Sequence, residues 1–271
     1  MNLIDLQKIL LIIVIFVPLE RLFALRPGQK ILRNGWVTDS LHVLATGPMI
    51  QIGTAVLLAL SFHASSLLVP AFVHTAVAAQ PTWLALIEIF FIADLGFYLA
   101  HRAFHKFPFL WRFHVVHHSI EELDWLAAHR VHPVDQILTK SASMIPVFAL
   151  GFSLEPIILF AMIYQWQSLL IHSNTRIGFG PLRWVFASPA FHHWHHADHP
   201  EAIDKNFAGQ LSLLDLVFGT MHMPDREMPR LYGTVDPVPN EYLGQLVYPF
   251  RRNQAVQSDS ASVAVSETTE S

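Results

Sequence analysis

The sequence of 271 residues contains no cysteine at all. This absence excludes disulfide bonds, thiolate metal ligands and thiol chemistry, so any metal ion must be held by nitrogen and oxygen atoms. Charged residues are also scarce, because Asp, Glu, Lys and Arg make up 14% of the chain, against about 25% in a soluble domain. The formal net charge is −4, and no basic face points to a nucleic acid partner. The low charge content indicates a membrane protein.

Long apolar segments take the place of the missing charges and predict an all-α fold, a polytopic membrane helical bundle. Residues 40–87 contain no Asp, Glu, Lys or Arg. The segments that we expect to cross the bilayer, by length and apolar composition, are 3–19, 41–62, 82–100, 134–151 and 156–172. The bundle has five spans if residues 3–19 cross fully, which we favour, and four if this segment loops back.

Histidine is abundant, with 17 residues, and three groups have helical spacing. The groups are HRAFH at 101–105, HVVHH at 114–118 and HHWHH at 192–196. Residues three and four apart share a helix face, so each group directs two or three imidazoles to one point. Imidazole is the commonest side-chain metal ligand. One such group is weak evidence, but three groups in one chain predict a metal site. Imidazole suits iron, zinc, copper and nickel, so the ligand type alone does not name the metal.

These three motifs resemble the histidine boxes of the fatty acid hydroxylase/sterol desaturase superfamily of membrane proteins. RVHP at 130–133 and KNF…LLDLVFGT at 205–220 are also similar to that family, and the likeness covers roughly residues 85–250. The resemblance implies two iron ions, O2 as co-substrate and a lipid substrate; zinc is possible in the isolated protein. The box residues that the resemblance implies as metal ligands are His101, His105, His114, His117, His118, His192, His195 and His196.

Other histidines are assigned by their position. His172 follows an expected span, where an ionisable residue is a functional candidate, and we predict a metal ligand there. His132 in RVHP is either a ligand or a hydrogen-bond partner of one. For His129 and His193 a ligand role is the less favoured interpretation. Solvated or hydrogen-bonded side chains are expected for the histidines outside the boxes, His42, His63, His74, His199 and His222.

Two carboxylates complete the predicted site. Asp94 lies two helical turns before His101 on the same face, where it would accept a ligand N–H and orient the ring. A salt bridge to Arg102 or Lys106 is the alternative for Asp94. Asp215, in LLDLVFGT, is a similar candidate on weaker grounds.

Domain boundaries and topology follow from the same patterns. Residues 1–84 are the predicted N-terminal spans, 85–250 the histidine-box domain with a cytoplasmic cap, and 251–271 a disordered tail. Lys and Arg are enriched in the loop 21–33 and around the boxes, as in cytoplasmic loops. Both regions lie on the cytoplasmic side only if two spans separate them. The segment 63–81, which holds Pro70, is therefore predicted not to span, although a loop, a re-entrant piece or a span would fit its composition.

The predicted reaction is hydroxylation or desaturation of a lipid C–H bond. Its electrons must come from a separate reductase or electron carrier, because the chain has no cysteine for an iron–sulfur cluster and no Gly-rich dinucleotide fingerprint. The alternative is a non-catalytic zinc-binding membrane protein or a divalent-metal transporter. A transporter is expected to hold its ligands near the bilayer midplane, whereas the boxes follow the ends of spans.

Overall fold

The computed structural model describes residues 3–224 and 227–251. This part of the chain is helical, and its only β-type pairings are two isolated bridges, Ala24–Thr175 and Ala197–Tyr232. The all-α helical bundle predicted from the apolar pattern is thus confirmed. The predicted tail from residue 252 onward lies outside the described residues.

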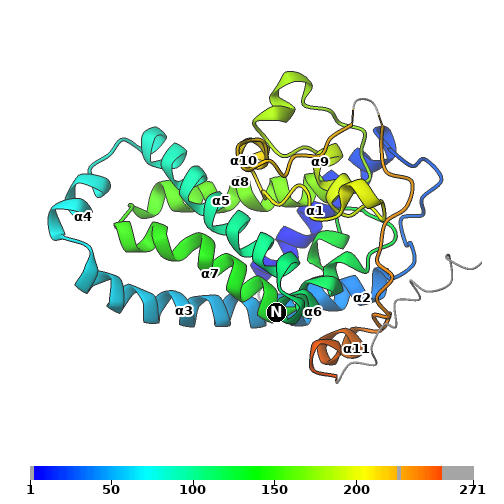
Figure 1. The fold of residues 1–271 in the computed structure, drawn as a ribbon, viewed down its shortest axis with the longest axis horizontal. Helices are drawn as coiled ribbons and strands as arrows, with labels where there is room; N and C mark the ends of the chain where they lie inside the picture. Colours follow the sequence, from blue (N-terminus) through cyan, green and yellow to red (C-terminus); the bar gives the residue numbers. More distant parts are fainter. Residues whose placement is uncertain (1–2, 225–226, 252–271) are drawn as a thin grey trace, which may run out of the picture.

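Five long helices form the body of the bundle. They are α1 (Leu3–Leu22), α3 (Gly47–Leu68), α5 (Thr82–Lys106), α7 (Pro133–Leu150) and α8 (Leu154–His172). Helix α7 packs against both α3 and α5, and α5 also packs against α8. Figure 1 shows these helices side by side, with the shorter cap helices gathered at one end of the bundle.

Three helical segments among the described residues are long and apolar enough to cross a membrane, at Trp36–Ser61, Thr82–Lys106 and Leu154–His172. They match three of the expected spans. Helices α1 and α7 also form where spans were expected but are not among these three; α7 carries Asp135 and Lys140 within 18 residues. The chain is a membrane protein, and the number of four to five spans stays a prediction.

The segment between the first two of these spans is too short to cross. Helix α3 continues to Leu68, and α4 (Ala71–Ala78) follows after Pro70, which has an extended backbone and starts the new helix. Eight helical residues extend only about 12 Å, against about 30 Å for the hydrocarbon layer. Figure 1 shows α4 at the end of the bundle remote from the cap, as a non-spanning turn requires.

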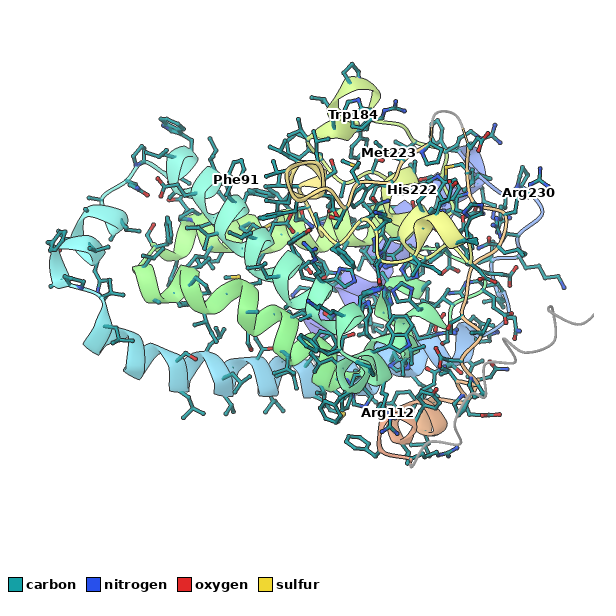
Figure 2. The ribbon with its side chains drawn as sticks, in the orientation of Figure 1. Phe91, Arg112, Trp184, His222, Met223 and Arg230 are labelled. Atoms are coloured by element: carbon teal, nitrogen blue, oxygen red, sulfur yellow. The ribbon has the colours of Figure 1, made fainter. Side chains whose placement is uncertain are left out.

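Bulky apolar side chains cover the outside of the bundle, as expected of a surface that faces lipid. Trp83, Phe91 and Leu99 on α5 are exposed, and Leu60 and Phe72 extend this surface over α3 and α4. Figure 2 shows Phe91 on the outer side of α5. A soluble protein rarely exposes so much contiguous apolar surface.

Small residues bring α5 and α7 into close contact. A Cβ atom at Gly96 would overlap the backbone carbonyl oxygen of Ala142, and the Ser143 hydroxyl donates to the Ala93 carbonyl at 2.8 Å. Close approach of this kind is common between membrane helices. It fixes α7 beside the part of α5 that leads to the first histidine group.

The cap consists of short helices joined by irregular segments. Its helices are α6 (Pro108–His118), α9 (Pro189–His195), α10 (Ser212–Phe218) and α11 (Tyr242–Val247), whereas α2 (Trp36–Leu41) leads into α3. The prolines of segment 221–248 predict a chain without regular structure, and this prediction is wrong for α11. The helix forms because nine residues without proline lie between Pro239 and Pro249. Its Gln245 side chain meets His42 Nε2 at 2.9 Å, which gives that histidine the hydrogen-bonded role expected of it.

Four buried charges connect the cap to the start of the bundle. Arg33 forms ion pairs with Asp39 at 2.6 Å and Asp124 at 2.7 Å, and Arg130 pairs with Asp39 at 2.5 Å. Removing one partner of a buried pair leaves an uncompensated charge, which typically costs 3–5 kcal/mol. Arg33 and Arg130 are therefore structural residues, although their sequence positions suggested free loop charges.

Candidate metal centre

The first histidine group gathers side chains from three helices. Its ligand nitrogens all lie within 4.8 Å of one another, and its members are His101, His105, His114, His118 and His195. Helix α5 supplies the first two, and Pro108 then starts α6 after an extended Phe107. This sharp turn folds the face of α6 that carries His114 and His118 back against the end of α5. Helix α9 adds His195 from the far part of the chain.

A second group of four histidines lies beside the first. It consists of His117, His172, His192 and His196, whose ligand nitrogens are also within 4.8 Å of one another. Neighbouring residues on a helix point about 100° apart, so α6 sends His117 to this group and His118 to the other. In the same way, His195 at the end of α9 belongs to the first group, and the next residue, His196, belongs to the second. The two groups are therefore adjacent, and the rings of His118 and His196 stack with centroids 4.7 Å apart.

Hydrogen bonds to one ring nitrogen fix the tautomers in the first group. His101 Nδ1 donates to the Phe207 carbonyl and His114 Nδ1 to the Asp135 carboxylate, both at 2.7 Å. The remaining Nε2 atoms then carry lone pairs, yet they lie only 2.9 Å apart. Two nitrogens that share one metal ion, each about 2.1 Å from it, are separated by about 3 Å when at right angles. A cation held between the two nitrogens would account for this arrangement.

The second group repeats the pattern. His172 Nδ1 donates to the Ser168 carbonyl at 2.7 Å, and His117 Nδ1 donates to the Arg130 carbonyl at 3.0 Å. Their Nε2 atoms lie 3.2 Å apart, and His192 Nε2 lies 2.8 Å from His172 Nε2. Again the lone pairs converge where a metal ion would satisfy them. A second ring nitrogen that donates to a carbonyl is a common feature of histidine metal ligands.

Unpartnered nitrogens give an independent indication of a metal site. The Nε2 atoms of His105 and His195 are buried and have no hydrogen-bond partner. His195 already donates its other nitrogen to the Lys205 carbonyl at 2.8 Å. Buried polar atoms without a partner are rare in native proteins. Both atoms belong to the first group, so a metal ion there would supply the missing interaction.

Burial keeps these imidazoles neutral. It lowers the pKa of His117 to about 3 and that of His195 to about 4, in each case because the charged form is poorly solvated. The pKa values of His114, His118, His192 and His196 lie well below the ordinary value for the same reason, with further lowering by neighbouring histidines. Metal binding requires the neutral imidazole, so protons do not compete with a metal at neutral pH.

The structure does not bring every predicted ligand to the two groups. His132 caps α7, because its Nδ1 accepts the Val134 backbone N–H at 3.2 Å, while its Nε2 lies 3.2 Å from the Leu246 carbonyl. His193, the less favoured candidate, hydrogen-bonds to the Tyr232 hydroxyl and the Ser173 carbonyl. Both residues support the cap that surrounds the groups.

The two predicted carboxylates bind backbone N–H groups and do not contact any described histidine directly. Asp94 accepts the backbone N–H groups of residues 209–211, and Asp215 accepts those of residues 207 and 208. Together they hold five consecutive backbone N–H groups. This segment includes the Phe207 carbonyl that accepts from His101. Among the described residues neither Asp94 nor Asp215 contacts a histidine N–H, which corrects the role predicted for Asp94.

Asp135, which was not predicted, makes the direct contact instead. Its Oδ2 accepts the His114 Nδ1–H at 2.7 Å, and its Oδ1 is buried without a partner. The residue sits in the first turn of α7, 21 positions from its partner, so helical spacing does not reveal it. The sequence nevertheless marks Asp135, because an acidic residue at the start of an apolar segment is a functional candidate in a membrane protein.

We expect Asp135→Asn to weaken metal binding about 10- to 100-fold, the usual effect of losing such an outer partner. The substitution keeps the shape but removes the charge that fixes the His114 tautomer. Competition with a chelator measures the affinity of the purified protein. Asp204→Asn is the matched control, because exposed Asp204 lies 3.4 Å from His105 Nδ1 and should matter little. Unchanged affinity in Asp135→Asn would contradict this role.

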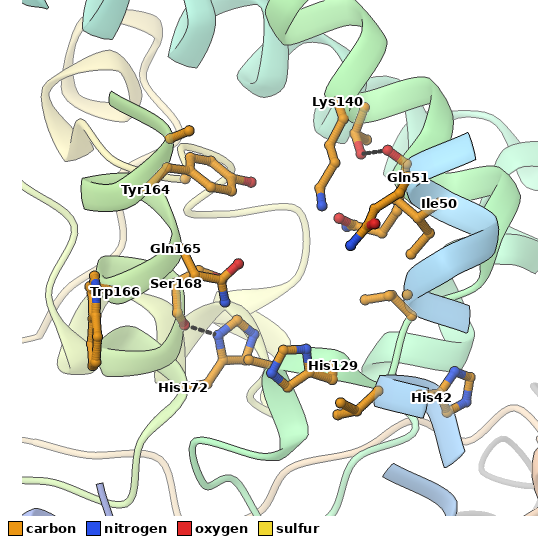
Figure 3. A pocket seen from close by; sticks show the side chains of 18 of the residues that line it. His42, Ile50, Gln51, His129, Lys140, Tyr164, Gln165, Trp166, Ser168 and His172 are labelled. Atoms are coloured by element: carbon orange, nitrogen blue, oxygen red, sulfur yellow. Dashed lines mark hydrogen bonds between the residues drawn. The ribbon is translucent and has the colours of Figure 1, made fainter. Parts of the chain in front are cut away.

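A cavity of about 750 Å³ borders both groups. Its walls come from α1, α3, α7 and α8, and it is lined by His101 and His114 of the first group and by three members of the second, His117, His172 and His192. Figure 3 shows His172 at one end of this space, with the side chains of α3, α7 and α8 around it. The volume is typical of small-molecule sites.

Comparison with known proteins shows the family to which the chain belongs. The profile of the fatty acid hydroxylase family matches residues 86–220, a range that contains all nine grouped histidines. The chain belongs to this family, as the resemblance of its histidine motifs predicted. No solved structure matches the chain.

Individual relatives are lipid hydroxylases and monooxygenases. The chain is 29% identical to the ornithine lipid hydroxylase OlsE of Rhizobium tropici over 87% of its own length and 70% of the relative's. It is 31% identical to alkylglycerol monooxygenase of Xenopus tropicalis, over 58% of the chain but only 33% of that protein. A putative methylsterol monooxygenase of Dictyostelium discoideum is 29% identical over 51% of each chain. The chain is therefore an oxidoreductase of a lipid-oxidising family.

Proposed function

We propose that this protein is a membrane-bound di-iron enzyme that uses O2 to hydroxylate or desaturate a C–H bond of a lipid. The observation that carries the proposal is the pair of adjacent histidine groups, five and four residues, each with converging nitrogens. Both groups border one cavity. The relatives' activities as lipid hydroxylases and monooxygenases support the same reaction class.

Each histidine group would hold one iron ion. When bound, the two ions supply reductive activation of O2, a chemistry that the protein side chains lack. The chain fixes the imidazoles through N–H bonds to the Phe207, Arg130 and Ser168 carbonyls. Hydroxylation consumes the C–H bond, O2, two electrons and two protons, and yields the alcohol and water. Desaturation removes two hydrogens and yields two waters from the same inputs.

A separate reductase or electron carrier would deliver the two electrons. The sequence contains no cysteine, which excludes a cysteine-held iron–sulfur cluster within this chain. Five histidines in one group exceed the four ligands of a structural zinc site, and the cavity gives a small molecule access to the centre. These features favour an enzyme over a zinc-stabilised scaffold.

Comparative lipid mass spectrometry of cells with and without the gene tests this proposal. We expect one lipid class to gain the mass of one oxygen, or to lose two hydrogens, only in cells that carry the gene. A strain that expresses His117→Ala is the matched control, because this variant differs from the intact protein only in one histidine of the second group. Identical lipid profiles in cells that make the intact protein would contradict the proposal.

We also propose that the histidine groups lie on the cytoplasmic side. Exposed Arg21 at the end of α1 and exposed Lys30 in the following loop are charges of the kind found on that side, whereas α4 lies at the opposite end of the bundle. Because the sequence has no cysteine, one introduced cysteine reports its own location. Thr75→Cys on α4 should react with an impermeant maleimide in intact cells, and Glu121→Cys near the histidines only after the membrane is opened. The reverse pattern would overturn this topology.

A further inference from the structure

The cavity carries polar side chains that an alkyl chain does not require, and four of them face the same open space from two sides. They are Gln51 of α3, Lys140 of α7, and Tyr164 and Gln165 of α8. Figure 3 shows Tyr164 and Gln165 on one side of the open space, and Lys140 and Gln51 on the other, all directed toward it. Gln51, Tyr164 and Gln165 lie within candidate membrane spans. Polar side chains at such positions commonly mark a substrate path.

Lys140 lies inside the bundle, whereas Lys8 of α1, the other lysine that lines the cavity, is exposed. The ion pairs of the described residues use Arg33, Arg130 and two histidines, and none uses Lys140. Its ammonium group also has no hydrogen-bond partner in the described part of the chain. Asp135 precedes it on α7 by five positions, which places the two side chains about 140° apart around the helix. A cation among apolar helices is costly unless an anion compensates it.

The neighbours of Lys140 are free to donate as well. The side-chain amides of Gln51 and Gln165 and the hydroxyl of Tyr164 have no hydrogen-bond partner among the residues that the structure describes. One ammonium, two amides and one phenol therefore face a shared space, and in the described part of the chain none of them is bonded to a protein acceptor. Carboxylate and phosphate oxygens accept hydrogen bonds from all four kinds of group, and bonds to a charged partner are the strongest.

We propose that Lys140 binds an oxyanion, a carboxylate or a phosphate, at the polar end of the lipid substrate, with Gln51 and Tyr164 as additional hydrogen-bond donors. This inference rests on the proposed function and adds that the polar end of the lipid enters the cavity. Asp135, which contacts His114, lies about 7.5 Å before Lys140 along α7. The C–H bond presented to the histidine groups is therefore near the anionic group and not at the far end of a long acyl chain.

Binding of three lipids with one acyl chain in common tests the proposal on the purified full-length protein. N-palmitoylglycine offers a carboxylate, palmitoyl lysophosphatidic acid a phosphate, and monopalmitoylglycerol no charge. We expect the unmodified protein to bind at least one anionic lipid about tenfold or more tightly than the neutral one, the usual effect of a charged hydrogen bond. Lys140→Met should abolish this preference and Lys140→Arg should retain part of it. Lys30→Met, which removes an exposed lysine outside the cavity, should leave it unchanged.

Equilibrium dialysis with labelled lipids gives the three dissociation constants without an electron donor or turnover. Tyr164→Phe gives a second measure, with a severalfold loss of anion affinity and no change for the neutral lipid. Preference for N-palmitoylglycine alone identifies a carboxylate, and preference for lysophosphatidic acid alone identifies a phosphate. Equal binding of all three lipids by the unmodified protein, or an unchanged preference in Lys140→Met, overturns the proposal. A protein that binds anionic lipids in this way but oxidises none would contradict the proposed function alone.

Discussion

His117→Ala is expected to lower the metal content of the purified protein from two ions per chain to one, and His195→Ala to remove the other ion. Each residue belongs to a different histidine group. His117 is the member of the second group that the Arg130 carbonyl orients. His195 brings to the first group an Nε2 that has no other partner. The double variant should therefore retain neither ion.

Turnover should fall to the background without enzyme in either single variant, because the metal centre carries chemistry that no side chain supplies. Elemental analysis of the purified variants measures the metal content, and lipid oxidation measures turnover. His74→Ala is the control, since His74 lies on α4 and its Nε2 contacts the Ala149 carbonyl at 3.0 Å. It should retain both ions. Full metal retention in the His117 and His195 variants would show that the groups do not hold metal.

The second large expected effect is the dependence of turnover on an external source of electrons. Purified protein supplied with lipid and O2 alone should be inactive, because the chain has no cysteine and therefore no cysteine-held cluster to store electrons. Adding an electron-transfer system should start turnover from this baseline, with O2 consumed in step with oxidised lipid. Continuous measurement of O2 consumption, with the His117→Ala protein as the matched control, follows this response. Turnover without any reductant would contradict the external electron donor.

Isotopic labelling distinguishes oxygenation from hydrolysis. If the product is hydroxylated, its new oxygen should come from labelled O2 and not from labelled water. A metal-bound hydroxide can instead attack an electrophile, and label from water would then appear in the product. That outcome would place the protein outside the oxygenases even if every histidine ligand were confirmed. Mass spectrometry of the product under both labels gives the answer.

Local periodicity determined much of this protein from sequence alone. The spacing of His101 and His105, and of the later boxes, depends only on 3.6 residues per helical turn. It predicted which imidazoles share a face before any contact was known. The non-spanning segment 63–81 followed from charge placement, and the structure agrees because Pro70 separates α4 from α3.

Other features depend on how distant helices pack, which no local period encodes. Adjacent His117 and His118 serve different groups because His118 meets the histidines of α5, whereas His117 meets His172 of α8. The roles of Asp94 and Asp215 required the contacts to residues 207–211, more than 100 positions from Asp94.

The position of α7 is the clearest case of a feature that tertiary structure decided. Close packing of Gly96 against Ala142 brings Asp135 to His114 and places Lys140 on the cavity wall. In the sequence both residues are charges within an apolar helix, with nothing to name their partners. Helical spacing determined which histidines can act together, and packing between helices decided how they divide into two groups, what orients them and which polar groups face the substrate cavity.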